Sequence, residues 1–232
     1  MRIWKRSYFC IGLLAAALLF AAISALCRVD VLPTIGKATS ARCIILDAGH
    51  GGEDGGAISC TGINESELNL QIARRLNDFL LAIGRPTKML RTQDVSLHTG
   101  TCSTIAEKKR SDLKHRVQMV QETENALLVS IHQNQFPESK YHGAQVFYAA
   151  SDGSEALAEC LQSALCTGLD PSNRRQIKPA DKVYLLSKVT CPAVLVECGF
   201  LSNPDEAARL SDPAYCRQMA FAVCCGVLQY AP

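Results

Sequence analysis

The sequence lacks the short motifs that mark several common nucleotide-binding and hydrolytic sites. No G-x-x-x-x-G-K-[ST] segment is present and no G-x-G-x-x-G follows a predicted strand, which excludes a phosphate-binding loop and a dinucleotide fingerprint. The absence of G-x-S-x-G excludes a serine hydrolase built on that elbow. The absence of a C-x-x-C pair argues against a thiolate zinc site. The sequence also contains no internal repeat and no low-complexity segment, so nothing of that kind indicates a second module.

Net charge is also scarce, at +2, and it comes from the N-terminal segment. Residues 1–28 contain four basic residues and no acidic residue. Removing those four from the total of 24 basic residues leaves 20 against 22 acidic residues. Because the rest of the chain has no basic patch, we expect no nucleic-acid partner.

The N-terminal segment has the pattern of a membrane anchor. Residues 7–27 form an uncharged apolar run, long enough to span a bilayer, and the basic residues before it predict an N-terminus kept inside. We expect residues 1–28 to hold an exported protein on the outer face of the cytoplasmic membrane. The alternative is a signal segment cleaved near Ile23–Ala25, which would release a secreted protein. Residues 29–41 read as a linker and residues 42–232 as the folded domain.

Cysteine is abundant, with 12 residues, of which ten lie outside the apolar run. Their spacing shows no disulfide framework, because they are scattered through predicted strands and helices. We interpret them as small buried hydrophobic residues.

The stretch from Cys43 to Leu70 organises the predicted domain. Apolar residues 44–46 predict a short buried strand, and a glycine-rich loop that contains His50 follows it. Asn64 and Glu67 predict a capped helix start, which places Glu65 at the first helical position. Because open α/β sheets carry their chemistry beyond the carboxyl ends of strands, His50 and Glu65 are candidate site residues.

Two later predicted strands are also followed directly by a histidine or a glutamate. The apolar run Ala126–Ile131 leads into His132, and Pro192–Val196 leads into Glu197. Taken alone, His132 could be a satisfied core histidine, and Glu197 could be a salt-bridged structural carboxylate. A carboxylate at the end of an apolar strand nevertheless needs a reason, since carboxylates are rarely buried without a partner. We therefore treat the four residues as one candidate set.

The remaining elements alternate between strands and helices around a long polar connection, residues 92–111. The patterns predict strands over Thr87–Arg91, Gly143–Ala149 and Lys182–Leu186, and helices over Asp112–Glu124, Ser154–Leu165 and Pro213–Tyr230.

The candidate set matches a known type of metal chemistry. Two imidazoles and one carboxylate, here His50, Glu65 and His132, are the ligands of a catalytic zinc site that leaves a fourth position for water. Zinc lowers the pKa of that water to about 7 and polarises the carbonyl under attack. A nearby carboxylate that does not bind the metal can carry the proton from the water to the leaving nitrogen, and Glu197 would take that role.

Four segments together carry a resemblance to a family. In chain order they read LDAGHGGEDGGA, ESELNLQIA, LVSIHQN and LVECGFLSNPDEA. Their order and type resemble the zinc-dependent N-acetylmuramoyl-L-alanine amidases of type 3, over about Cys43 to Tyr230. The resemblance implies Zn²⁺ bound by His50, Glu65 and His132, with Glu197 as the catalytic carboxylate. It also implies a single three-layer α/β domain with a twisted, mostly parallel sheet between helices.

The implied reaction is hydrolysis of the amide between N-acetylmuramic acid and L-alanine in peptidoglycan. The apolar anchor, the lack of wall-binding repeats and the segments 111–116 and 136–145 look like the sporulation members of the family, which strip stem peptides during spore cortex formation. The product there becomes the muramic-δ-lactam that germination enzymes recognise. Some such amidases need an accessory activating protein. Two departures from the family pattern, Ala48 and Gln133, are expected to leave the ligands untouched.

Three rival interpretations remain open. One is a general cell-wall autolysin of the same chemistry, which often carries wall-anchoring repeats. Another is a catalytically idle wall-binding protein, although all four candidate residues are present. The third is a zinc carboxypeptidase, which would shorten stem peptides rather than release them intact.

Overall fold

The computed structural model describes residues 41–231. The predicted membrane segment, residues 1–28, and nearly all of the predicted linker, residues 29–41, lie outside the described residues. Within residues 41–231, no helix is both long enough and apolar enough to cross a membrane.

Six strands form one mixed sheet in the order β2-β1-β3-β6-β4-β5. The strands are β1 (Cys43–Ala48), β2 (Thr87–Met89), β3 (Ala126–Asn134), β4 (Gln145–Tyr148), β5 (Lys178–Pro179) and β6 (Ala193–Phe200). Strands β2, β1, β3 and β6 are mutually parallel, whereas β4 pairs antiparallel with β6. The predicted α/β domain with a mostly parallel sheet is therefore confirmed.

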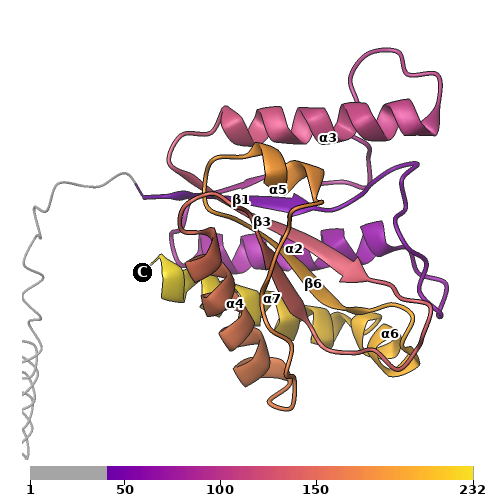
Figure 1. Ribbon diagram of the computed structural model, residues 1–232, viewed down its shortest axis with the longest axis vertical. Helices are drawn as coiled ribbons and strands as arrows, with labels where there is room; N and C mark the ends of the chain where they lie inside the picture. The colour runs from indigo at the N-terminus through magenta and orange to yellow at the C-terminus, as the bar shows by residue number, and fades with distance from the viewer. Residues whose placement is uncertain (1–40, 232) are drawn as a thin grey trace, which may run out of the picture. The chain divides into compact units, whose positions relative to one another are not determined.

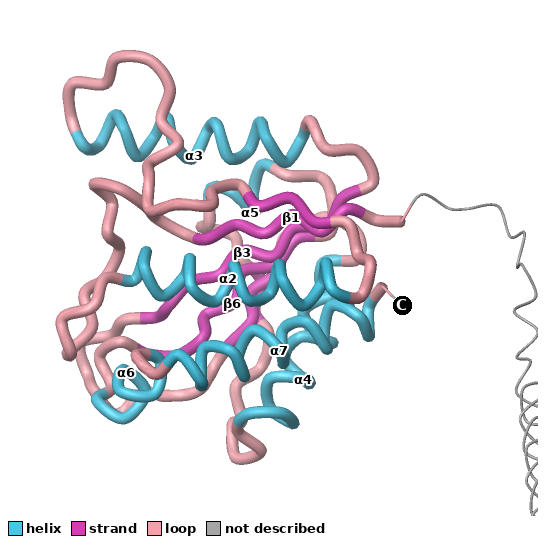
Figure 2. Tube along the Cα trace, turned by 180° about the vertical axis from the view of Figure 1, so that it is seen from behind, coloured by secondary structure: helices cyan, strands magenta, loops and turns pink. Residues whose placement is uncertain are grey.

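Helices cover both faces of this sheet (Figures 1 and 2). The helices are α2 (Glu65–Ala82), α3 (Ile105–Gln121), α4 (Ser154–Leu169), α5 (Tyr184–Lys188), α6 (Pro204–Leu210) and α7 (Pro213–Tyr230). The larger apolar core lies where α2, α4 and α7 pack on the sheet. Side chains from alternate sheet positions pack with α3 and α5 in a smaller core on the other face. Each strand of the centre is thus buried on both faces, as its continuous apolar run requires.

Helix α2 packs one apolar face against the sheet. Its buried apolar side chains recur at helical spacing on α2: Leu68, Ile72, Leu76 and Leu80. Gly84, with a φ of +76°, follows the helix end, where a left-handed conformation favours glycine.

Two predicted boundaries are wrong for identifiable reasons. Helix α3 begins at Ile105 rather than at Asp112, and Thr104 caps it in a reciprocal pair with Glu107. The first turns of α3 are largely exposed, so they carry no apolar periodicity to reveal them. Residues 182–186, predicted as a strand, instead include the start of the short helix α5, which begins at Tyr184. A run of that length does not distinguish a strand from a buried helical turn.

Candidate active site

His50 lies in the loop that follows β1 and has an unusual backbone conformation, with a φ of +61°. Its ring is oriented by Asp54, since His50 Nδ1 lies 3.0 Å from Asp54 Oδ2. The other ring nitrogen, Nε2, lies 3.3 Å from Glu65 Oε2. A carboxylate bound to one imidazole nitrogen commonly fixes the tautomer that presents the other nitrogen to a metal. In the sequence, Asp54 is one of several acidic residues in and around the glycine-rich loop, and no pattern there identifies it as the partner of His50.

Glu65 is the first residue of α2 and is almost completely buried. Its Oε2 accepts a hydrogen bond from the backbone N–H of Ala57 at 3.0 Å. Its Oε1 accepts from Asn69 Nδ2 at 3.2 Å and from the backbone N–H of Gln133 at 3.1 Å. The carboxylate is therefore fixed from three directions, and the helix N-terminus favours its negative charge. The contact from position 133 comes from the backbone, which other residue types would also supply, whereas the Gln133 side chain donates to Asn69 Oδ1 at 3.1 Å rather than to a candidate ligand.

The start of α2 is built differently from the predicted capping box. Asn64 occupies the N-cap position but its side chain makes no capping hydrogen bond, and Glu67 is exposed. Instead, the backbone N–H groups of Glu65 and Ser66 donate to the carbonyls of Ala57 and Gly55. The glycine-rich loop itself thus satisfies the first donors of the helix and locks Glu65 in place.

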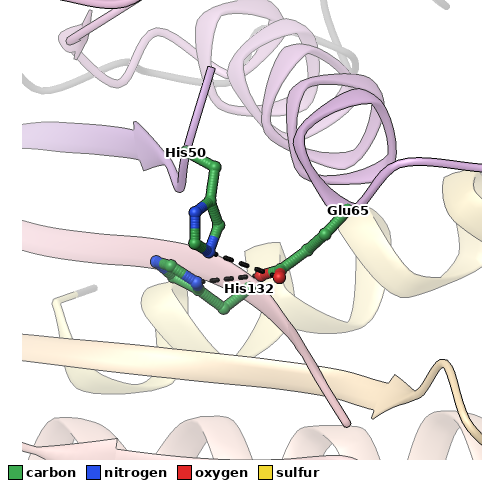
Figure 3. A group of neighbouring side chains, drawn as sticks. All are labelled: His50, Glu65 and His132. Carbon is green, nitrogen blue, oxygen red and sulfur yellow. Dashed lines mark hydrogen bonds and ion pairs between the residues drawn. The ribbon is translucent and has the colours of Figure 1, made fainter. Parts of the chain in front are cut away.

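The structure brings His50, Glu65 and His132 together, as Figure 3 shows. His132 lies within β3 rather than after it, and its Nδ1 is 3.0 Å from Glu65 Oε1. One potential ligand atom from each residue falls within 4.8 Å of the others. The two imidazole rings meet edge to face, with centroids 5.0 Å apart. Two histidines and a carboxylate converge here from three separate elements.

The charges of this group are coupled. Burial opposes ionisation of Glu65, but hydrogen bonds from His132 and His50 hold the pKa of its carboxyl well below the usual range. Burial likewise opposes protonation of His50, yet hydrogen bonds with Glu65 and Asp54 raise the pKa of its imidazole above 6.5. The ionised Glu65 carboxylate is the form that binds a divalent cation, and a cation at this site would bind His50 in its neutral form and so displace the proton that the carboxylates favour there.

Two glycines leave the space that these side chains occupy. A Cβ added at Gly49 would lie 2.2 Å from His132 Nε2. A Cβ added at Gly56 would lie 2.6 Å from Glu65 Oε2 and 2.9 Å from His50 Cδ2. The glycines of the loop are therefore required by close approach to the candidate ligands.

Glu197 lies within β6, in register with His132 of β3. Its Oε2 is buried and has no hydrogen-bond partner among residues 41–231. Burial and the nearby Glu65 raise the pKa of Glu197 to about 7, although His132 acts in the opposite direction. A buried, unpartnered carboxylate that titrates near neutral pH is poised to exchange protons.

Buried Arg116 holds the histidine loop from the α3 side. Its guanidinium forms ion pairs with Asp47 and Asp112. It also donates to the carbonyl of Ala48 at 2.9 Å and to the carbonyl of His50 at 2.7 Å. Burial opposes ionisation of Asp47, but Arg116 and a hydrogen bond from Ser130 hold the pKa of that carboxyl below its usual range.

A second buried guanidinium, Arg91, holds the same loop from the β2 side. It donates to the carbonyls of Ala48, Gly49 and Ser66 at 2.8, 3.0 and 2.9 Å. Together the two arginines fix the backbone before and after His50 and the start of α2. The sequence patterns did not reveal either role, because an arginine in a strand or a helix is ordinarily a surface residue.

A cavity of about 320 Å³ opens beside His50 and His132. Apolar side chains such as Leu113 line much of it, and Lys182 and Tyr184 lie at its α5 side. A substrate in this cavity would reach the histidines and the face of the sheet that carries Glu197. The donor set, the glycine cradle and the unpartnered carboxylate all fit a metal-assisted hydrolytic site.

Comparison with known proteins adds independent information. Residues 44–229 match the family described as N-acetylmuramoyl-L-alanine amidase. The germination-specific N-acetylmuramoyl-L-alanine amidase of Bacillus subtilis is 36% identical over 192 residues, which cover 82% of this chain and 80% of that protein. The structure of the CwlD amidase from Clostridioides difficile, in complex with the GerS lipoprotein, is similar with a TM-score of 0.79 and 38% identity, covering 82% and 98% of the chains. AmiC2 of Nostoc punctiforme is similar with a TM-score of 0.69 and 28% identity, covering 82% and 96%.

Proposed function

Because the chain belongs to the N-acetylmuramoyl-L-alanine amidase family, we propose that it cleaves peptidoglycan with a zinc ion held by His50, Glu65 and His132. The bond cut is the amide between N-acetylmuramic acid and L-alanine. The observation that carries the zinc assignment is the convergence of two imidazoles and an ionised, buried carboxylate beside an unpartnered Glu197. This is the ligand type of catalytic zinc sites that keep one position open.

The chain's own residues account for the proton transfers. Zinc, when bound, would supply Lewis acidity toward the attacking water and the scissile carbonyl. Glu197 would take a proton from the water and deliver it to the leaving nitrogen of L-alanine. Its raised pKa suits both roles, since the ionised form accepts the proton and the neutral form donates it. Asp54 and Asn69 would hold His50 and Glu65 in their orientations.

Metal analysis tests the ligand assignment. The purified chain should hold one zinc ion, lose hydrolytic activity when a chelator removes it, and regain activity when zinc is restored. His132→Ala should lose the zinc, whereas His98→Ala is the control, because His98 bonds Ser96 outside the metal group. Stoichiometric zinc in His132→Ala would show that the ligand set is wrong.

We further propose that the amidase acts in spore cortex formation, stripping stem peptides so that muramic-δ-lactam can form. Similarity to a germination-specific amidase and to an amidase complexed with a lipoprotein supports this role. A general autolysin of the same chemistry is the alternative. Cortex from sporulating cells that carry Glu197→Gln should lack muramic-δ-lactam while vegetative walls stay normal. Normal cortex with altered vegetative walls would favour the autolysin.

The site of action follows from the same proposal. Residues 1–28 would anchor the protein, residues 29–41 would tether it, and residues 42–232 would act on the outer face of the cytoplasmic membrane. An accessory lipoprotein partner is proposed by analogy with the lipoprotein-bound structure. Membrane fractionation with N-terminal sequencing distinguishes an anchor from a cleaved signal. Crosslinking in sporulating cells should capture a lipoprotein, and its absence would remove the partner from the proposal.

A further inference from the structure

A second cavity, lined by basic residues, is formed partly by the segment just before β4, the strand that pairs with β6 and its Glu197. It has a volume of about 420 Å³ and is lined by residues 140–142 and 172–175. We call these two segments the basic groove. It contains Lys140, His142, Arg174 and Arg175, with no acidic residue among its lining side chains. The groove shares no lining residue with the cavity lined by Tyr184, and its two segments precede β4 and β5 in the chain.

Arg175 links this groove to Glu197. Gln145 of β4 stands opposite Glu197 of β6 in antiparallel register. Residues so paired present their side chains on the same face, with Cβ atoms about 5 Å apart. Arg175 Nη1 donates to Gln145 Oε1 at 3.2 Å, and Arg175 Nε donates to the carbonyl of His142 at 2.6 Å. The guanidinium of Arg175 is thus one side chain removed from the catalytic carboxylate.

The position of Arg175 is fixed, while its charge is not neutralised. Its Cζ lies 4.4 Å from the centre of the Phe200 ring, so the guanidinium is stacked and held in one orientation. Neither Arg175 nor its neighbour Arg174 forms an ion pair with any carboxylate in residues 41–231, and Arg174 donates instead to the carbonyl of Pro171. By contrast, exposed Lys140 pairs with Glu138 at 3.4 Å. The groove therefore carries two guanidiniums, from Arg174 and Arg175, whose charges no carboxylate in residues 41–231 pairs.

We propose that the basic groove binds a free carboxylate of the stem peptide on the leaving side of the scissile amide, an assignment that rests on the proposed function. The sugar half of the substrate is neutral, whereas the peptide half carries carboxylates. Planar guanidiniums recognise carboxylates with paired hydrogen bonds. The peptide would then extend from Glu197 toward β4, and the sugar would occupy the cavity beside Tyr184.

The test compares two muropeptides that differ at one group. The second peptide residue carries either a free α-carboxylate or the corresponding carboxamide, and kcat/KM is measured for both with the zinc-loaded full chain. Wild type should prefer the acidic muropeptide by about tenfold, the effect of one charge-assisted hydrogen bond. Arg175→Gln should bring the ratio of the two kcat/KM values close to one, with the loss appearing as a higher KM for the acidic muropeptide. Arg174→Gln, at an exposed residue that bonds only carbonyls of its own turn among residues 41–231, should weaken the preference.

Controls locate the effect. Arg74→Gln removes an exposed charge on α2, and Lys182→Gln removes the cation from the rival cavity. Both should retain the preference of wild type. Equal cleavage of the two muropeptides by wild type, or loss of the preference in Lys182→Gln alone, would overturn the groove assignment and leave the amidase proposal standing. Cleavage of neither muropeptide by zinc-loaded wild type would overturn the proposed function and this inference with it.

Discussion

Arg116→Met should destabilise the domain more than any exposed substitution on α3. Arg116 is 2% exposed, and its partners Asp47 and Asp112 are 1% and 8% exposed. Removing the guanidinium leaves the buried Asp47 carboxylate with Ser130 as its hydrogen-bond partner among residues 41–231. It also takes a donor from the His50 carbonyl, whereas the Ala48 carbonyl keeps its bond from Arg91. Breaking a buried ion pair from one side costs about 3–5 kcal/mol, which is a large share of the roughly 5–15 kcal/mol that stabilises a domain.

Urea unfolding of residues 29–232 measures this cost. With a slope of about 2 kcal/mol per molar urea, the midpoint should fall by about 2 M. Arg110→Met is the matched control, because Arg110 is exposed on the same helix, and its free energy of unfolding should stay within about 0.5 kcal/mol of wild type. Asp47→Asn should recover part of the loss in the Arg116→Met background, because the orphaned charge is then gone.

A cost below about 1 kcal/mol for Arg116→Met would refute this reasoning. It would mean that solvent or a rearranged loop compensates Asp47 at little expense, and that the backbone of His50 is held by other contacts. The same variant should also bind zinc more weakly, because the carbonyl of His50 loses its donor.

Three further predictions concern the site and its support. Glu197→Gln should retain zinc and lower kcat by about 10²- to 10⁴-fold, because an amide cannot accept the proton; wild-type kcat would remove Glu197 from the mechanism. Gly49→Ala should weaken zinc binding at least tenfold as measured by chelator competition, since the added methyl would displace the His132 ring, and unchanged affinity would contradict the cradle. The folded-state pKa of Asp47 is lowered, so its stabilising contribution is present above the ordinary pKa of about 3.9 and is lost as the pH falls below it. The difference in unfolding free energy between wild type and Asp47→Asn should therefore shrink below about pH 4, and a difference that is constant from pH 6 to pH 3 would contradict this.

The central strands could be identified from sequence because local patterns determine them, although β3 and β6 extend beyond their predicted ends to include His132 and Glu197. The apolar runs before His50, His132 and Glu197 identify central strands, and parallel strands bring their carboxyl ends to one edge. Glu65 joined the set because the helix start could be placed to within one residue, although the predicted cap was wrong.

The residues that hold the site in place could not be predicted from local sequence patterns. Arg91 and Arg116 contact the loop across 42 or more residues of chain, so no local spacing reveals them. The register that places Gln145 opposite Glu197 depends on an antiparallel strand whose direction the sequence does not fix. The short helix α5 was mistaken for a strand because five residues carry too little periodicity.

The most direct test of zinc-dependent amidase action is mass spectrometry of muropeptides incubated with residues 29–232, with added zinc and then with a chelator. The account predicts release of intact stem peptides that begin with a free L-alanine amine, abolished by chelation and restored by zinc. Shortened peptides still attached to muramic acid would indicate a carboxypeptidase instead. Release that persists after complete removal of the metal would contradict the role assigned to His50, Glu65 and His132.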